Sequence, residues 1–199
     1  AALTVVGGEY VNALNAALDY QDQTGAAQIH AYDVPQTVIG QGTVFSEWDR
    51  QGLDADTILI AVGGGGLIAG ALAWFGGRRK VVAVEPHTCA TLNTALVNQS
   101  PIDVPVSGVA ANALGAKRIG QICYDLATDY GVTSVLVRDD DILAAQAKLW
   151  NDLRQYVEPA GATALAALLS GAYVPEPGEK VAVLMCGANP MILPQIGTI

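Results

Sequence analysis

The chain has 199 residues, of which 51% are hydrophobic and only 15% are charged. This length suits one large domain or two small ones, and the composition is typical of a well-packed α/β protein. The net charge of −9 and the isoelectric point of about 4.4 argue against nucleic-acid binding through bulk electrostatics. Cys89, Cys123 and Cys186 follow no metal-ligand spacing, and no signal-peptide pattern opens the sequence, so we expect a cytoplasmic protein.

The hydrophobic patterns predict strands that alternate with helices along the chain. The predicted strands cover residues 1–6, 27–32, 57–62, 80–85, 133–137 and 180–186, and the predicted helices cover residues 10–24, 41–51, 67–75, 88–98, 117–130, 139–155 and 160–170. Residues 100–115 are rich in proline, glycine and small residues and should be irregular. This alternation predicts an α/β fold with a mostly parallel sheet and helices on both faces, where ligands bind at the carboxyl ends of the strands.

Four consecutive glycines, Gly63, Gly64, Gly65 and Gly66, separate the predicted buried strand at 57–62 from the predicted helix at 67–75. Glycines leave no side chain to cover the main-chain N–H groups, which can converge on a small anion at the start of the helix. The helix dipole adds to this preference for negative charge. The stretch therefore predicts a phosphate-binding loop.

Three other interpretations compete for this stretch. Residues 58–77 carry no charge, so a transmembrane helix can be drawn through them, although each glycine would cost about 1 kcal/mol in its middle. A tight turn without a ligand needs only one or two glycines. Gly64-x-Gly66-x-x-Ala69 also fits a dinucleotide-binding spacing, with Glu85 about where a ribose-binding acid would lie. Four adjacent glycines, however, satisfy many such spacings by accident.

Five segments, taken in order, resemble the threonine/serine dehydratases. This branch of the fold type II (tryptophan-synthase-β-like) pyridoxal-phosphate enzymes also includes serine racemase. The segments are IGQGT at 39–43, read as the turn into a helix, VGGGGLIAG at 62–70, VEP at 84–86, VEPAGA at 157–162 and MCGAN at 185–189. The resemblance covers nearly the whole chain, and its tetraglycine is specific for the dehydratase/racemase branch. It implies that residues 1–39 are the remainder of a smaller domain and residues 40–199 a large cofactor-binding domain.

The resemblance also implies which residues hold pyridoxal 5'-phosphate. The phosphate would be bound by the N–H groups of Gly63, Gly64, Gly65, Gly66 and Leu67. Cys186 would contact the pyridine nitrogen, and Glu158 would lie near the ring. A neutral partner leaves that nitrogen unprotonated, which favours β-elimination over transamination. From position alone, Cys186 is equally well a small buried hydrophobe and Glu158 an acid at a helix start.

Glu85 matches a glutamate with which some family members bind a cation. The expected second carboxylate is replaced around Thr91, so Glu85 is only a weak metal candidate. We expect no divalent metal and predict that Glu85 is a solvated or helix-capping acid. His30 and His87 have no visible partner constellation and are predicted to be surface or loop residues.

The family also needs a lysine that forms a Schiff base with the cofactor, ahead of a Ser-x-Gly-Asn loop that binds the substrate carboxylate. Neither motif is present here. Lys80, Lys117, Lys148 and Lys180 are each predicted to be solvated charges, Lys117 being the nearest to the predicted site. We therefore expect no catalytic residue in this chain and interpret it as the C-terminal part of a dehydratase, inactive alone.

The intact enzyme is expected to be a homodimer that converts threonine or serine into a 2-oxo acid and ammonia. Two alternatives stay open: a non-catalytic domain that keeps only the phosphate-binding loop, and a serine racemase-type enzyme. A partial domain would expose apolar edges, so we expect association or marginal stability.

Overall fold

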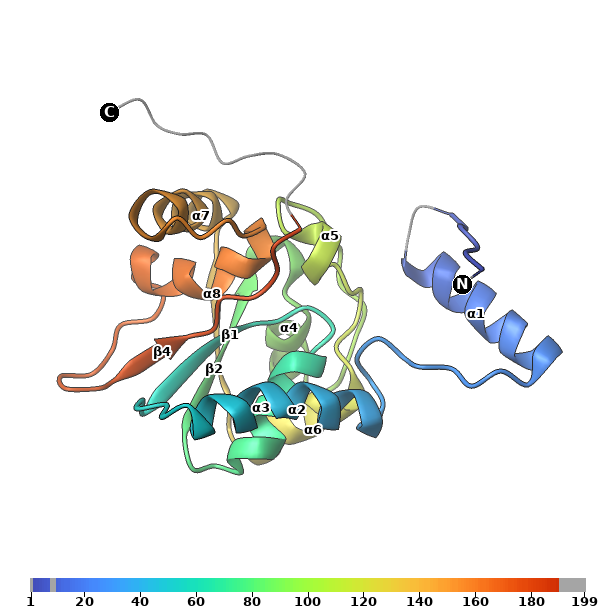
Figure 1. Cartoon of the computed structure of the whole chain (residues 1–199), viewed down its shortest axis with the longest axis horizontal. Helices are drawn as coiled ribbons and strands as arrows, with labels where there is room; N and C mark the ends of the chain where they lie inside the picture. The colour runs from blue at the N-terminus through green and yellow to red at the C-terminus, as the bar shows by residue number, and fades with distance from the viewer. Residues whose placement is uncertain (1, 8–9, 190–199) are drawn as a thin grey trace. The chain divides into compact units, whose positions relative to one another are not determined.

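The computed structural model describes residues 2–7 and 10–189 (Figure 1). The chain forms two compact units, Ala1–Ala31 and Tyr32–Ile199. The assignment of residues 1–39 and 40–199 to the two domains of a larger enzyme stays a prediction. Among the described residues, no helix is long and apolar enough to cross a lipid bilayer.

The first unit contains the helix α1 (Tyr10–Thr24), as predicted. Gly25 ends it with a φ of +69°, and its N–H donates to the Gln21 carbonyl oxygen at 2.7 Å. The strands predicted at 1–6 and 27–32 are wrong for the residues described, because no strand lies beside them to complete a hydrogen-bonded ladder. Of the predicted inward face, Leu14 is half-buried and Leu18 is 42% exposed, while the side chain of Val11 lies outside the described part.

In the second unit, the described strands form one parallel sheet in the order β3-β2-β1-β4. They are β1 (Thr57–Ala61), β2 (Lys80–Pro86), β3 (Thr133–Val137) and β4 (Val181–Val183). This confirms the predicted parallel sheet. Strand β4 is shorter than predicted because the chain leaves the ladder after Leu184, whose N–H donates to the Leu59 carbonyl oxygen at 3.1 Å.

The helices of this unit follow the predicted order with shifted ends, except that α5 lies in the stretch 100–115 that was predicted to be irregular. They are α2 (Pro35–Arg50), α3 (Gly66–Phe75), the 3-10 turn η1 (His87–Cys89), α4 (Thr91–Asn98), α5 (Ala111–Leu114), α6 (Gln121–Asp129), α7 (Asp139–Leu153) and α8 (Pro159–Ser170). Helix α2 starts at Pro35, earlier than predicted, because proline is favoured in a first helical turn. The segment at 39–43 is therefore helical and not a turn. Gly42 of this segment packs closely against Gly70 of α3, since a Cβ on Gly70 would lie only 2.6 Å from the Gly42 nitrogen.

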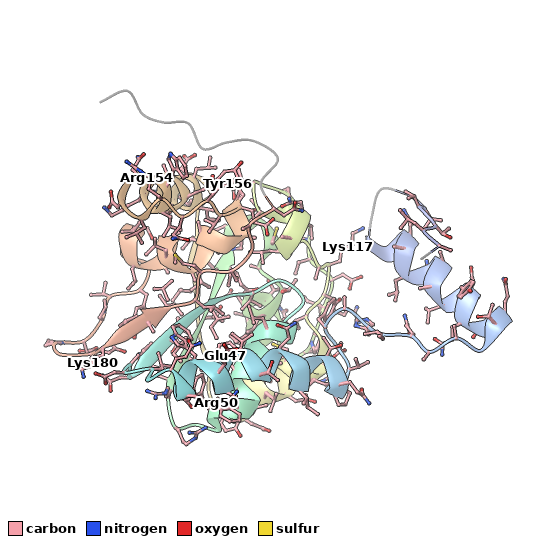
Figure 2. All side chains as sticks on the ribbon, viewed as in Figure 1. Glu47, Arg50, Lys117, Arg154, Tyr156 and Lys180 are labelled. Atoms are coloured by element: carbon pink, nitrogen blue, oxygen red, sulfur yellow. The ribbon has the colours of Figure 1, made fainter. Side chains whose placement is uncertain are left out.

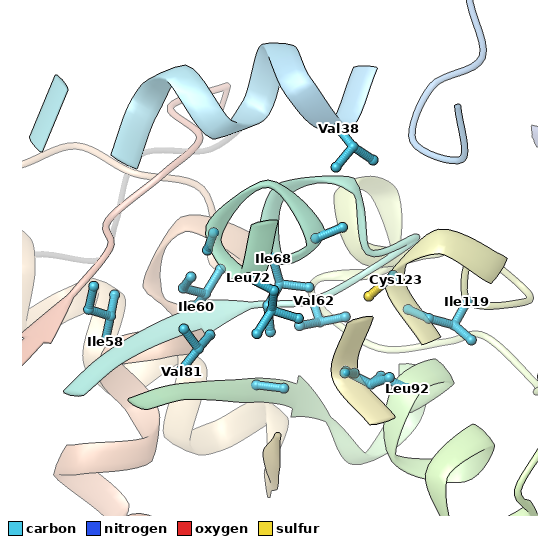
Figure 3. Packing of buried hydrophobic residues seen from close by; sticks show 14 of the residues in the cluster. Val38, Ile58, Ile60, Val62, Ile68, Leu72, Val81, Leu92, Ile119 and Cys123 are labelled. Atoms are coloured by element: carbon cyan, nitrogen blue, oxygen red, sulfur yellow. The ribbon is translucent and has the colours of Figure 1, made fainter. Parts of the chain in front are cut away.

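The sheet is buried on both faces, which explains why its central strands are continuous apolar runs (Figure 1). On one face, Ile58, Ile60 and Val62 pack against α2, α3, α4 and α6 (Figure 3). On the other face, Leu59 and Ala61 pack against α5, α7 and α8. This layering leaves the carboxyl ends of β1, β2 and β4 at one end of the sheet, where the glycine loop follows β1, Cys186 follows β4 and Glu85 lies near the end of β2.

Candidate functional site

The glycine loop joins β1 to α3, as predicted. The Val62 N–H donates to the Val84 carbonyl oxygen at 3.0 Å, so the loop leaves the sheet from a fixed point. Gly65, the residue before α3, has a φ of +93°. This is a left-handed conformation that side chains disfavour. A Cβ on Gly65 would also lie 2.6 Å from the Cys123 sulfur, so both the conformation and the space require glycine here.

Close packing requires glycine at the two preceding positions as well. A Cβ on Gly63 would lie 2.8 Å from the Leu114 Cα, and one on Gly64 would collide with the Tyr32 ring. Gly63 is buried and Gly64 is half-buried. Protein atoms thus occupy the space into which side chains at these positions would project. The loop can therefore bind a ligand only through its main-chain groups.

Three carbonyl oxygens of the loop, those of Gly63, Gly64 and Gly65, accept hydrogen bonds. Gly63 O accepts from the Thr91 hydroxyl at 2.7 Å, Gly64 O from the Gly120 N–H at 3.0 Å, and Gly65 O from the Ala69 N–H at 2.9 Å. In a planar trans peptide, the N–H of the next residue points in the opposite direction. The N–H groups of residues 64–66 therefore point away from these three donors.

Those N–H groups have no acceptor within the described part of the chain. None of its hydrogen bonds is donated by the main chain of residues 63–67, although Gly63, Gly65 and Gly66 are buried. A buried donor without a partner costs about 1–3 kcal/mol. The groups lie at the start of α3, whose first turn carries no acidic residue and whose dipole favours an anion. These N–H groups could therefore hold an anionic group such as a phosphate.

Cys186 and Glu158 come together beyond the end of β4. The Glu158 N–H donates to the Gly187 carbonyl oxygen at 3.2 Å, and a Cβ on Gly187 would collide with the Glu158 carboxylate. Glu158 is only 8% exposed and directly precedes α8. Burial, and secondly the negative charge of Glu158, raise the pKa of the Cys186 thiol, so it stays neutral at pH 7. Whether either residue contacts a cofactor stays a prediction.

Glu85 is a helix-capping acid, and the prediction that it could be solvated is wrong, because its side chain is fully buried. Its carboxylate accepts the N–H groups of Leu92 and Asn93, both at 2.8 Å, at the start of α4. Burial raises the pKa of Glu85 to about 7, against the opposing effect of these donors. Across residues 2–7 and 10–189, no group of three or more His, Cys, Asp or Glu side chains could hold a metal ion.

All four lysines are exposed, and Figure 2 labels Lys117 and Lys180. Lys80 and Lys180 stand at the starts of β2 and β4, where Lys80 contacts the Tyr173 hydroxyl at 2.9 Å and Lys180 pairs with Asp54 at 2.5 Å. Lys148 pairs with Asp152 at 2.6 Å on α7. Lys117 is exposed, ahead of α6. As for the histidines, His87 is exposed in η1, and His30 lies half-buried in the irregular segment after α1.

Sequence reasoning missed the residues that surround the glycine loop. Tyr32 and Leu114 cover it, and Thr91 and Gly120 bind its carbonyl oxygens. All four are far from the loop in the sequence. No local pattern identifies them, because their role depends on which elements the sheet places side by side.

Residues 1–187 match the protein family described as pyridoxal-phosphate dependent enzyme. The chain is similar to the L-threonine dehydratase biosynthetic IlvA of Salmonella typhimurium, with 34% identity over 189 residues that cover 92% of this chain and 36% of that protein. It is also similar to the phenylserine dehydratase of Ralstonia pickettii, with 31% identity over 172 residues that cover 85% of this chain and 53% of that protein. The chain thus spans about one third to one half of the length of these relatives.

Two solved structures share the fold closely. The processed form of threonine deaminase isoform 2 from Solanum lycopersicum has a TM-score of 0.85 and 27% identity, covering 94% of this chain and 56% of that one. Maize serine racemase has a TM-score of 0.85 and 26% identity, covering 93% of this chain and 59% of that one. The parallel sheet with flanking helices is the fold type II arrangement that the sequence predicted. On these matches, the chain belongs to the family of pyridoxal-phosphate dependent enzymes.

Proposed function

We propose that the glycine loop binds the phosphate of pyridoxal 5'-phosphate in an enzyme that removes ammonia from threonine or serine to give a 2-oxo acid. The observation that carries this proposal is the row of N–H groups at residues 63–67, partly buried at a helix start and without an acceptor in the described chain. Such groups fit a phosphate because they supply several donors and no competing negative charge. Relatives named threonine dehydratase support the choice of reaction.

In that reaction, the residues of the candidate site would bind and orient the cofactor. The N–H groups bind the phosphate, while Tyr32 and Leu114 cover the loop and exclude water from that side. The neutral Cys186 thiol can meet a ring nitrogen without placing a negative charge beside it, since its pKa is raised. Glu158, buried next to it, orients the segment that carries Cys186. When bound, pyridoxal phosphate supplies the electron sink for the charge that develops on the substrate carbon.

We further propose that none of the four lysines binds the cofactor covalently and that this chain alone is inactive. Lys80 and Lys180 lie at the amino ends of their strands, away from the glycine loop, and Lys148 is paired on the surface of α7. A nucleophilic lysine must instead be desolvated or flanked by cations near the site. In this proposal, the lysine and the loop for the substrate carboxylate come from a part of the enzyme outside this chain.

A racemase of the same family is the second candidate. Its support is that maize serine racemase matches the fold as well as the tomato threonine deaminase does, with the same TM-score of 0.85. The dehydratase is favoured because the relatives with 34% sequence identity carry that name. Either enzyme would act on a small amino acid. We also propose that the intact enzyme is a homodimer and lies in the cytoplasm.

A titration of the chain with pyridoxal 5'-phosphate, followed by its absorbance, tests the proposal. Pyridoxal, which lacks the phosphate, is the matched control. We expect saturable, reversible binding of the phosphate form, at least about tenfold tighter than that of pyridoxal. Borohydride treatment and mass spectrometry should find no adduct on a lysine. Equal affinity for both compounds would contradict the phosphate site. An adduct on Lys117 or another lysine would contradict the proposal that no lysine of this chain binds the cofactor covalently.

A further inference from the structure

Two carboxylates, Asp33 and Glu85, hold the two helix starts that bind the carbonyl oxygens of the glycine loop. We propose that both are positioning residues of the phosphate site, Asp33 acting through Gly120 and Glu85 acting through Thr91. This inference rests on the proposed function, because it assigns these residues to the same phosphate site.

The first connection runs from Asp33 to the start of α6. Its carboxylate accepts the N–H groups of Gln121 and Ile122, each at 3.0 Å. The N–H of the preceding residue, Gly120, donates to the Gly64 carbonyl oxygen at 3.0 Å. Three successive N–H groups are thus divided between Asp33 and the glycine loop. Space is tight at this point, since a Cβ on Gly120 would lie 2.8 Å from the Asp33 carboxylate. Asp33 therefore fixes the direction in which Gly120 donates.

The second connection runs from Glu85 to the start of α4. Its carboxylate accepts the N–H groups of Leu92 and Asn93, and one of its oxygens lies 3.2 Å from the Thr91 hydroxyl oxygen. That hydroxyl donates to the Gly63 carbonyl oxygen at 2.7 Å. Glu85 and Thr91 are both fully buried. On the far side, the Ser134 hydroxyl on β3 lies 3.4 Å from the carboxylate, so Glu85 is held from two elements.

A run of four glycines needs such outside support. Glycine has more conformational freedom than any other residue, so an unsupported loop would sample many orientations of its N–H groups. Fixing the carbonyl oxygens of Gly63 and Gly64 on one side also fixes the following N–H groups on the other, because the peptides are planar. The conformational entropy of the loop is then lost during folding and not on binding, which increases the affinity for a phosphate.

A matched control is available on α7. Asp141, in the first turn of this helix, also holds a helix start, since it accepts the N–H of Arg138, the residue before α7, at 3.1 Å. Helix α7 donates no hydrogen bond to the glycine loop in the described structure. Loss of the Asp141 cap should therefore lower the melting temperature without changing the phosphate site. This separates a general loss of stability from a loss of positioning.

The experiment measures the affinity ratio of pyridoxal 5'-phosphate to pyridoxal for Asp33→Asn, Glu85→Gln and Thr91→Val. Thr91→Ser, which keeps the hydroxyl, and Asp141→Asn are the controls. Hydrogen exchange of the peptide covering residues 63–67 is followed in parallel. We expect the three test variants to lose about tenfold in the ratio and to exchange faster at the loop. Both controls should keep the wild-type ratio, and Asp141→Asn should only melt earlier.

If Asp33→Asn and Thr91→Val keep the affinity ratio and the hydrogen-exchange rate of the wild-type protein, the inference is overturned and the proposed function stays intact. A wild-type chain that does not prefer the phosphate form would overturn both. Should Glu85→Gln fail to fold, Thr91→Val carries the test, because it removes only the hydroxyl that reaches Gly63.

Discussion

The Glu85 carboxylate lies 3.2 Å from the Thr91 hydroxyl oxygen, inside the protein and next to the glycine loop. This pair connects the carboxyl end of β2 with the loop that follows β1, since the Thr91 hydroxyl donates to the Gly63 carbonyl oxygen. A carboxylate in such a place has two opposing influences on its pKa. Burial raises it, while the N–H and hydroxyl donors around it lower it, and burial dominates.

The raised pKa of Glu85 predicts a stability that falls as the pH rises. The carboxyl titrates near 4.5 in the unfolded chain and near 7 in the folded one, so the folded state binds more protons between these values. The free energy of unfolding should therefore decrease from pH 4.5 to pH 7, by about 3 kcal/mol at most. Urea unfolding at several pH values checks this against Glu85→Gln, which should lack this decrease. Parallel profiles for the two proteins would contradict the prediction.

Gly65→Ala should destabilise the protein more than Gly171→Ala. Both glycines have positive φ angles, +93° and +76°, so each substitution should cost about 1 kcal/mol in backbone strain. A Cβ on Gly171, at the end of α8, meets no atom within 4 Å. One on Gly65 meets the Cys123 sulfur and, at 2.8 Å, a methyl carbon of Ile119, which should add about 1–3 kcal/mol. Urea unfolding of both variants measures the difference. Equal losses in the free energy of unfolding would contradict the close contacts around Gly65.

Cys186 should be the cysteine that reacts in the folded protein, because Cys89 and Cys123 are buried at 0% and 2% exposure. Burial and the charge of Glu158 raise its pKa above the usual 9.0, so alkylation should become half-maximal only above that pH. Glu158→Gln should lower this midpoint, since it removes the negative charge.

Alkylation by iodoacetamide, followed by mass spectrometry, provides the measurement. Cys186→Ser should abolish the labelling, and pyridoxal 5'-phosphate should slow it if the thiol faces the bound ring. A midpoint that does not move in Glu158→Gln would contradict the contact between the two residues.

The sequence was sufficient to predict the central layers of the fold. Strands β1, β2 and β3 are short apolar runs between turn signals, and α1 and α3 have apolar residues at helical spacing followed by glycine. These signals are local, so their positions could be predicted to within about one residue. The parallel sheet then followed from the alternation of strands and helices.

Other parts depend on distant contacts and could not be predicted. Residues 2–6 and 27–32 have strand-like composition, but a strand exists only beside a partner strand. The glycine loop between β1 and α3 was predictable from its four glycines, and its binding of a phosphate stays a proposal. Capping by Glu85 was one of two expectations for that residue, but the cap made by Asp33 was not predicted, because its carboxylate reaches a helix that begins well after it in the sequence.

Nuclear magnetic resonance of the chain labelled with ¹⁵N-glycine tests the central claim most directly. In the proposed site, the N–H groups of Gly63, Gly64, Gly65 and Gly66 donate to a phosphate. On addition of pyridoxal 5'-phosphate, the amide resonances of these four residues should shift downfield, while those of Gly25 and Gly171, outside the loop, should stay unchanged. Saturable binding without a shift at residues 63–66 would place the phosphate elsewhere and contradict the account.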